Sequence, residues 1–257
     1  MATGNHNTYI GDENGKAVQP TKIYIGDPNN VAKLVSKIYV GDSNNKAVQV
    51  WPRYNWSDTY QRCEYLYNTN YTEYINTGIY PDSNTRVIID AKKNNSTAST
   101  TDRYLFKTTF GETNFGLYWD QNASNSGYIY FNFGAADVVG FHTSDWWNDR
   151  HTYDYNRSGG EFYIDTTKIG QSTNTFSTMS YPVIIWDYTT VESRKNDSWI
   201  ARWNVYSFKA YQNDVLIRDM VPCYRKSDYK PGMYDFVNDV FYVNAGSGEF
   251  YKGPDVN

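Results

Sequence analysis

Polar and apolar residues alternate with a period of two along much of this chain. In residues 205–211 one alternating set is Val205, Ser207, Lys209 and Tyr211, and the other is Tyr206, Phe208 and Ala210. A period of two is typical of a strand whose two faces meet different surroundings. From residue 63 onward, polar turn signals separate such runs roughly every 8 to 12 residues, which predicts an all-β, two-sheet antiparallel sandwich.

Three short segments are predicted to be turns of this sandwich. Residues 212–214 (Gln-Asn-Asp) separate two extended runs and predict a hairpin. Residues 156–160 (Asn-Arg-Ser-Gly-Gly) join the runs 151–155 and 161–165 in the same way. The Lys-Pro-Gly sequence at 230–232 predicts a further turn, because proline and glycine favour turn conformations.

An internal repeat precedes the predicted sandwich. Tyr-Ile-Gly-Asp at 9–12 recurs at 24–27 and, as Tyr-Val-Gly-Asp, at 39–42, so the period is 24 − 9 = 15 residues. Each unit predicts a strand, a tight turn and a second strand. Because so small a hairpin cannot bury its apolar face alone, we expect three stacked hairpins that serve anchoring or oligomerisation.

These patterns divide the chain into three parts. Residues 1–53 are the predicted hairpin-repeat region, 54–62 a linker and 63–257 the sandwich domain.

The Asp-x-Asn sequence of each repeat also occurs in calcium-binding loops. However, the twelfth position of such a loop requires a glutamate, and here it holds Ile23, Ile38 and Arg53.

Composition supports the β prediction, and the charge and hydropathy of the chain argue against some classes of partner. The chain contains 26 tyrosines, and aromatic residues suit the pleated surface of a sheet. Its net charge is −4, with basic and acidic residues interspersed, which argues against nucleic-acid binding. No run is long enough to predict membrane insertion, and the first residues lack the apolar region of a signal peptide. We therefore expect synthesis in a host cytoplasm without classical secretion.

Two cysteines, Cys63 and Cys223, lie near the start and the end of the predicted sandwich. The first and last strands of a sandwich are often neighbours, so a disulfide between them is conceivable. The absence of a signal peptide favours two reduced thiols instead, because disulfides are rare in reducing compartments.

Both ends of the predicted sandwich resemble one known family. Residues 64–66 (EYL) and 72–90 (TEYINTGIYPDSNTRVIID) resemble the opening strands of concanavalin A-like lectin/glucanase (laminin-G-like) domains, which are common in phage structural proteins and bacterial surface proteins. Residues 206–254 are similar to the closing strands of that family. The resemblance implies a two-sheet antiparallel jelly roll. More loosely, the N-terminal repeats resemble short units of phage tail-associated proteins.

No catalytic residues are predicted. The glucanases of this family carry paired carboxylates at alternate positions of one strand, so that both face the cleft. Here Glu161 and Asp165 are four residues apart with no third acid, which favours a solvated hairpin face. His6, His142 and His151 lack companion ligands at zinc spacing, and no nucleotide-binding loop occurs, so we expect neither metal nor cofactor.

Sugar binding is the remaining chemistry, because aromatic rings and planar polar side chains together recognise sugars. The sequence places Trp119 with Asp120 in one predicted loop. A second predicted loop contains Trp146, Trp147, Asn148 and Asp149. Trp186 ends an apolar run and is predicted to lie in the core.

These expectations point to a non-enzymatic phage virion protein, a tail, fibre or head-decoration component. Its N-terminal repeats would bind other virion proteins or form a homo-oligomer. Its lectin-like domain would adhere to host-surface or mucosal glycans. The alternatives are a bacterial carbohydrate-binding module outside any virion, a glycoside hydrolase and a purely architectural domain, because a fold alone does not fix function.

Overall fold

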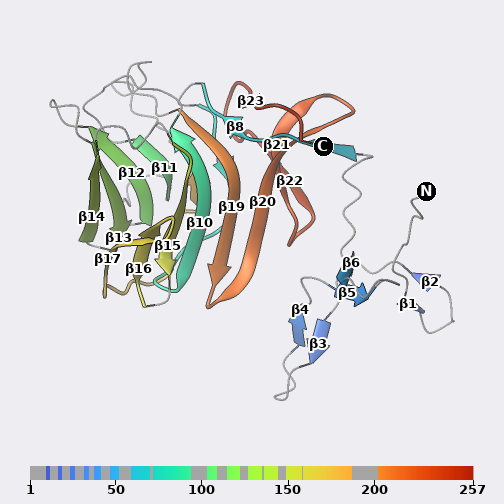
Figure 1. Ribbon diagram of the computed structural model, residues 1–257, viewed down its shortest axis with the longest axis horizontal. Helices are drawn as coiled ribbons and strands as arrows, with labels where there is room; N and C mark the ends of the chain where they lie inside the picture. Colours follow the sequence, from blue (N-terminus) through green and yellow to red (C-terminus); the bar gives the residue numbers. More distant parts are fainter. Residues whose placement is uncertain are drawn as a thin grey trace. The chain divides into compact units, whose positions relative to one another are not determined.

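The computed structural model of the protein describes nine ranges: 59–69, 72–93, 103–108, 115–121, 127–134, 136–143, 149–157, 159–186 and 202–256. It also describes six short strands between residues 10 and 51. For those six strands, and at a few positions in later ones, only the backbone is described. The chain divides into two compact units, Met1–Trp56 and Ser57–Asn257. All the elements with described bounds are strands (Figure 1).

The first unit contains three antiparallel hairpins. They are β1 (Ile10–Gly11) with β2 (Ala17–Val18), β3 (Tyr24–Gly26) with β4 (Ala32–Leu34), and β5 (Ile38–Gly41) with β6 (Ala47–Trp51). In each hairpin the glycine of the repeated motif pairs with an alanine, as in Gly11 with Ala17 and Gly26 with Ala32. The three predicted hairpins are therefore confirmed, and the sequence period is also a period of strand register.

The second unit is a sandwich of two antiparallel sheets. In spatial order, the larger sheet contains β17 (Thr167–Gln171), β16 (Glu161–Ile164), β15 (His151–Arg157), β10 (Thr85–Lys93), β19 (Trp203–Gln212), β20 (Val215–Arg225), β21 (Lys230–Asp235) and β22 (Val240–Val243). β7 (Tyr60–Arg62), β8 (Leu66–Tyr67) and β23 (Tyr251–Lys252) extend it. The smaller sheet contains β14 (Ala136–Thr143), β13 (Gly127–Phe133), β12 (Phe115–Gln121), β11 (Arg103–Thr108), β18 (Val183–Ile185) and β9 (Ile75–Asn76). The predicted all-β, two-sheet antiparallel sandwich is confirmed.

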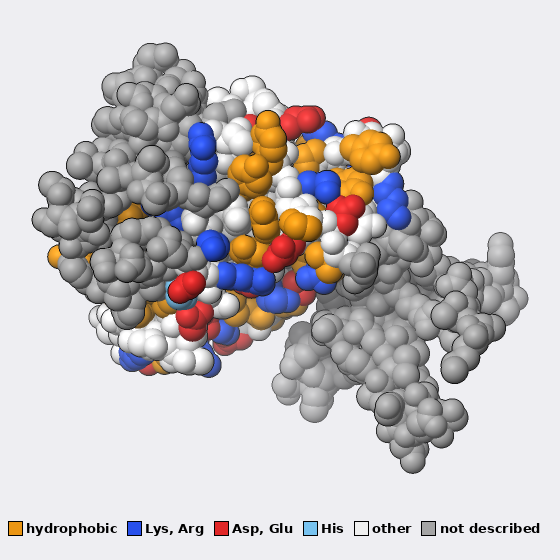
Figure 2. Space-filling model, turned by 45° about the horizontal axis from the view of Figure 1, so that its top comes forward, with side chains coloured by type: hydrophobic (Ala, Val, Ile, Leu, Met, Phe, Trp, Pro, Cys, Tyr) orange, Lys and Arg blue, Asp and Glu red, His pale blue; other side chains and the backbone are white. Residues whose placement is uncertain are grey.

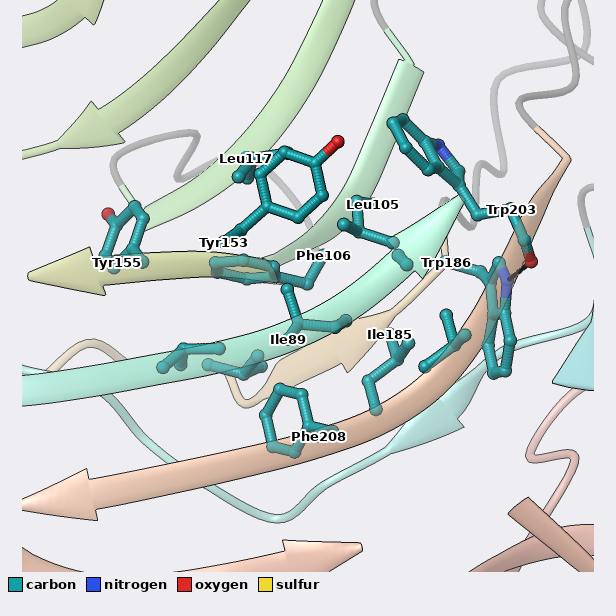
Figure 3. Packing of buried hydrophobic residues seen from close by; sticks show 14 of the residues in the cluster. Ile89, Leu105, Phe106, Leu117, Tyr153, Tyr155, Ile185, Trp186, Trp203 and Phe208 are labelled. Atoms are coloured by element: carbon teal, nitrogen blue, oxygen red, sulfur yellow. Dashed lines mark hydrogen bonds between the residues drawn. The ribbon is translucent and has the colours of Figure 1, made fainter. Parts of the chain in front are cut away.

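The core lies between the two sheets, as the alternation predicts. In β10 the side chains of Val87, Ile89 and Ala91 are buried, while the intervening side chains are less buried. Figure 3 shows Ile89 and Phe208 of the larger sheet packed with Phe106 of the smaller one. Each such side chain, once fully buried, contributes about 1.5–3 kcal/mol to stability.

One part of the predicted alternation is wrong, in β19. The sequence places Val205 on the same face as Ser207 and Lys209, but Val205 is fully buried in the core with Phe208. The reason is a register shift between β10 and β19, which leaves Tyr206 without a directly opposite partner. An extra residue of this kind reverses the facing of all residues beyond it.

The predicted turn at 230–232 is also wrong. These residues belong to β21, where Gly232 pairs with both Cys223 and Val243. A Cβ atom on Gly232 would overlap the carbonyl oxygen of Tyr242, so the glycine permits a close approach of strands rather than a turn. The turn itself consists of residues 226–229, because Arg225 pairs with Lys230. The predicted hairpins at 212–214 and 156–160 are confirmed.

The start and the end of the second unit lie side by side. Residues 60–62, which the sequence pattern assigns to the linker, form β7 and pair with β20. The amide of Val256 donates to the carbonyl oxygen of Arg62 at 3.0 Å, and that of Glu64 donates to Pro254 at 2.8 Å. Residues from both ends of the unit are therefore held together by backbone hydrogen bonds.

Both cysteine side chains are buried and free. The amide of Cys63 donates to the carbonyl oxygen of Pro222 at 3.1 Å, so Cys63 lies beside the segment of β20 that contains Cys223. The expected neighbourhood of the two residues is thus confirmed.

The described surface carries both signs of charge. Figure 2 shows lysine and arginine side chains next to aspartate and glutamate, with hydrophobic side chains between them. On the outer face of the larger sheet, Lys209 pairs with Asp219 at 2.6 Å. Within the described ranges there is no helix of the length and apolar character needed to cross a membrane.

Candidate functional site

A polar cavity of about 430 Å³ opens at one rim of the sandwich. The walls of the cavity are formed where strand ends meet, because β10 begins at this rim and β15, β17 and β19 end there. Its lining comes from four chain segments: Ser83, Asn84 and Arg86; Asn156, Gly159 and Gly160; Ser172, Thr173, Asn174 and Thr175; Asn213 and Asp214, with Phe133 beside them. This volume lies within the range of about 300–1,000 Å³ that is typical of small-ligand sites.

Two asparagine side chains fix the walls of this cavity. Asn156 has a positive φ of 59°, and its Nδ2 donates to the carbonyl oxygens of Ser83 (3.0 Å) and Thr85 (2.8 Å). Asn174 Nδ2 donates to the carbonyl oxygen of Phe133 at 3.2 Å. Each amide therefore links a loop to a strand end of a different segment, and the walls do not depend on the ligand for their shape.

Gly160 brings two of the segments into direct contact. Its φ is +78°, and a Cβ atom there would overlap the carbonyl oxygen of Ser172. The amide of Ser172 donates to the carbonyl oxygen of Gly160 at 2.9 Å. Only glycine allows both this conformation and this approach, so Gly160 is required for the cavity wall.

Several polar groups of the cavity have no partner. The side chains of Asn84, Asn213, Asp214, Thr173 and Thr175 make no hydrogen bond with the part of the chain that the structure describes. Asn213 and Asp214 form the two-residue turn between β19 and β20, with φ values of 49° and 62°. That turn places an amide and a carboxylate next to each other at the mouth.

The net charge of the lining is close to zero. Arg86 is already paired, since its Nε and Nη2 donate to the carboxylate of Asp154 at 2.7 and 2.6 Å. This hydrogen bonding raises the pKa of Arg86, whose guanidinium also lies 5.3 Å from the ring centroid of Tyr211. The charge of Asp214 also raises the pKa of Arg86, although its carboxylate makes no hydrogen bond with the described residues, and the remaining lining groups are neutral amides, hydroxyls and backbone. Such a lining suits an uncharged ligand rich in hydroxyl groups.

The predicted sugar-binding residues are not brought together at this cavity. Trp119 was expected in a loop, but it lies in β12 with 1% of its surface exposed, so its ring is part of the core. The expectation of a Trp119 platform is therefore wrong, because β12 continues to Gln121. Asp120 lies in the same strand.

The second predicted loop is described only at its end. Trp146, Trp147 and Asn148 lie outside the described residues, and Asp149 is exposed. Its neighbour Arg150 donates to the carboxylate of Asp90 at 2.8 and 2.5 Å. Because His151 pairs with Ala91, this end of β15 is the end away from the cavity.

A row of tyrosines crosses the outer face of the smaller sheet. Tyr118 pairs with Tyr104 on one side and Tyr130 on the other, with ring centroids 4.9 and 4.7 Å apart. The planes of Tyr118 and Tyr130 differ by 6°, and their separation is about the spacing of neighbouring strands, about 4.8 Å. The rings therefore stand face to face and cover one another, which is cross-strand packing rather than an open platform.

The two carboxylates considered for catalysis are each engaged locally. Glu161 accepts hydrogen bonds from Lys168 Nζ (2.6 Å) and Tyr163 Oη (2.8 Å), which lower the pKa of this carboxyl. Asp165 sits in the turn after β16, where it contacts His151 Nδ1 at 2.7 Å. The two groups thus have separate partners on this hairpin.

Of the cavity segments, only 156–160 and 212–214 were indicated by sequence patterns, and only as turns. The segments that contain Asn156, Asn174 and Asn213 carry the asparagine, serine and glycine typical of tight turns. These segments differ from ordinary turns because four of them lie together in the folded chain. No local sequence pattern predicts that proximity. The signal that could have been used is the number of asparagines at turn positions where glycine would also fit.

Known proteins give no guide to this site. No family model matches the chain, and no curated protein is similar to it in sequence. Within the described ranges, no three histidine, cysteine, aspartate or glutamate residues are arranged to hold a metal ion. The chemistry of the site therefore has to be inferred from its lining.

Proposed function

We propose that this chain is a non-enzymatic virion structural protein that displays its sandwich for adhesion to host-surface or mucosal glycans. The observation that supports it is the polar cavity, whose unpartnered amide, hydroxyl and carboxylate groups line a space of about 430 Å³. A sugar presents closely spaced hydroxyl groups that both donate and accept. Asn213 can satisfy a donor and an acceptor, and the adjacent Asp214 can accept from two hydroxyls.

The N-terminal hairpins support the structural part of this proposal. Each has strands of only two to five residues, and two-stranded hairpins of this length are marginally stable in water. The same glycine–alanine pairing recurs at Gly11, Gly26 and Gly41. Repeated short hairpins suit docking to a repeated partner surface, or to further copies of the chain, as in a tail, fibre or head decoration.

Glycan-array binding of the full chain tests the adhesive function. The key variant is Asp214→Asn, which removes the unpartnered carboxylate of the cavity but retains the shape and the tolerance of positive φ. We expect this variant to bind any glycan recognised by the wild type about tenfold more weakly or worse, because hydrogen bonds to a charged group are among the stronger ones.

The matched control is Asp239→Asn. Asp239 is also exposed and also has a positive φ (58°), but it lies in the turn between β21 and β22, away from the cavity lining. Its binding should equal that of the wild type. Absence of glycan binding by the wild type, or equal binding by both variants, would contradict the proposed site.

Particle membership needs its own measurement. Mass spectrometry of purified phage particles from cells that produce the chain should detect it in proportion to a structural protein. A chain that is monomeric in solution and absent from such particles, yet binds glycans through the cavity, would instead be a bacterial carbohydrate-binding module.

A further inference from the structure

Backbone strain marks two aromatic residues of the sandwich. Seven described residues other than glycine have positive φ, and five of them are asparagine or aspartate, which tolerate that conformation. The remaining two are Trp186 (φ 68°) and Tyr229 (φ 56°). For a bulky side chain the left-handed conformation costs about 1–2 kcal/mol, so each of these residues needs a compensating interaction.

Burial of its side chain compensates the backbone strain at Trp186. Its side chain is 0% exposed, and its Nε1 donates to the carbonyl oxygen of Trp203 at 2.9 Å (Figure 3). Its ring centroid lies 4.6 Å from that of Phe250. Tyr229 has no comparable surroundings, because 75% of it is exposed. It occupies the last position of the turn between β20 and β21 (Figure 1), where glycine or asparagine would carry no strain.

The ring of Tyr229 is held by one contact, a stack on Tyr224. The centroids are 5.8 Å apart and the planes differ by 20°. On Tyr224 itself, Lys252 Nζ lies 4.8 Å from the ring centroid, and the hydroxyl donates to Asp255 at 3.1 Å. Tyr224 is therefore a fixed base for the exposed ring. The other face of Tyr229 contacts no ring or cation among the described residues.

Hydrogen bonds link the two ends of the turn that presents Tyr229. Arg225 donates twice to the carboxylate of Asp228, at 3.0 and 2.6 Å, and the amide of Lys230 donates to the same carboxylate at 3.2 Å. The hydrogen bond from Arg225 lowers the pKa of Asp228 to about 2, so this carboxylate stays ionised at any ordinary pH. These bonds favour the turn conformation in which Tyr229 stacks on Tyr224.

The charged side chains around the ring are engaged in pairs. Arg225 pairs with Asp228, Lys230 pairs with Glu249 at 2.7 Å, and Lys252 pairs with Asp255 at 2.6 Å. Lys226 of the same turn is not free either. A surface whose charges are already engaged favours neither an acidic nor a basic ligand. One open ring also offers far less apolar area than the roughly 800 Å² per partner of a stable protein interface. It matches the apolar face of a single sugar ring.

We propose that Tyr229 is a saccharide-stacking residue whose open face binds the C–H face of a neutral pyranose. The ligand class rests on the proposed adhesive function, but the surface is different from the cavity. β20 runs from the cavity turn at Asp214 to the turn at Tyr229, and its 11 residues span about 35 Å. The two sites would thus contact separate sugars of one long glycan, or two glycans of one surface, and bind more tightly together than either alone.

Saturation-transfer NMR on the full chain tests this proposal. The probes are methyl β-glucopyranoside and methyl β-galactopyranoside at millimolar concentration, with saturation of the aromatic protons. For the wild type we expect the strongest transfer to the axial C–H protons H1, H3 and H5 of the glucoside. Tyr229→Asn removes the ring but keeps a residue suited to the backbone, and we expect the affinity of this face contact to fall about threefold or more.

Three further variants separate the outcomes. The control is Tyr80→Asn, an exposed tyrosine without positive φ, which should behave as the wild type. Asp214→Asn should leave the face-specific transfer in place, and the double variant with Tyr229→Asn should lose it. If Asp214→Asn abolishes all saturation transfer and Tyr229→Asn changes none, sugar binding in the cavity is supported and the stacking proposal is overturned.

Two further results would also contradict the stacking proposal. If neither glycoside receives saturation from the wild type, the stacking proposal is overturned, and the adhesive function then depends on glycan-array binding through Asp214 alone. If Tyr229→Asn leaves glycoside binding unchanged but converts an oligomer to a monomer in analytical ultracentrifugation, the ring belongs to a contact between copies, and the stacking proposal is overturned.

Discussion

Trp186 and Tyr229 share a backbone conformation that bulky residues avoid, one inside the sandwich and one at the tip of a hairpin. In the interior, the surroundings of Trp186 account for the strain, because burial and a hydrogen bond offset it. At the surface, the stack on Tyr224 is the one ring contact of Tyr229 among the described residues. A positive φ at a bulky residue is thus explained by packing where the side chain is buried. Where the side chain is exposed, the same strain points to a functional role.

The strongest test of this comparison is Trp186→Ala. Removal of a fully buried indole should lower the free energy of unfolding by about 3–5 kcal/mol, because alanine loses the packing but keeps the strained positive φ. Chemical unfolding followed by fluorescence measures it. Tyr181→Ala, an exposed neighbour in sequence, is the control and should change stability by less than about 0.5 kcal/mol. A small effect of Trp186→Ala would mean that packing does not compensate the strain.

A pair of glycines sharpens the comparison by separating strain from steric overlap. Gly159 and Gly160 both have φ of +78°, but a Cβ atom on Gly159 would meet only Gln171 Nε2 at 3.7 Å, whereas one on Gly160 would overlap the backbone of Ser172. Gly159→Ala should cost about 1 kcal/mol from the conformation alone, and Gly160→Ala about 2–3 kcal/mol. Thermal and chemical unfolding should rank them in this order, and equal losses would show that the cavity wall can shift.

At Tyr229 the expected effect is smaller and depends on the residue introduced. Tyr229→Ala removes the stack but keeps a residue that disfavours positive φ, whereas Tyr229→Gly removes both. The glycine variant should therefore be more stable than the alanine variant by about 1 kcal/mol, although both lose the ring. Unfolding curves of the two variants measure this difference directly. A more stable alanine variant would disprove the strain at this position.

The smallest effect leaves the sequence unchanged and concerns the buried thiols. Burial raises the pKa of Cys63 to about 12, and it raises that of Cys223 as well. Because the unfolded thiol ionises near its ordinary pKa of about 8.5, stability is unaffected below that pH and falls as pH rises toward 12. At pH 9 the loss for Cys63 should be less than about 1 kcal/mol.

A thiol reagent provides the readout for this last prediction. At pH 8 the folded protein should react slowly with Ellman's reagent, and denaturant should release two fast-reacting thiols. Fast reaction of either thiol in the folded protein would contradict their burial.

Much of the fold could be predicted, because hydrophobic alternation is a local signal. The alternation of β10 and the hairpin at 212–214 follow from residues next to one another in sequence. The facing of Val205 could not be predicted, since it depends on a register shift against β10. The same limit applies to Gly232, which is explained by the neighbouring strand β22 rather than by a turn.

The candidate site was less accessible to sequence than the fold. Aromatic residues drew attention to Trp119, but an aromatic residue next to a polar run can equally be the last inward-facing residue of a strand. Asp214 was recognised as a turn residue, which it is, whereas Asn156, expected at the start of a turn, lies near the end of β15 with a positive φ. Their role in a cavity arises from the order of strands in the sheet, which brings together segments more than 50 positions apart (Asn156 and Asp214, 214 − 156 = 58).

The backbone hydrogen bonds between Arg62 and Val256, and between Glu64 and Pro254, determine how the second unit responds to force. A pull applied at residue 62 and at residue 256 acts across these few bonds and does not pass through the core. For the same reason, the unit could be spliced into a surface loop of another protein, because the two points of attachment are already neighbours.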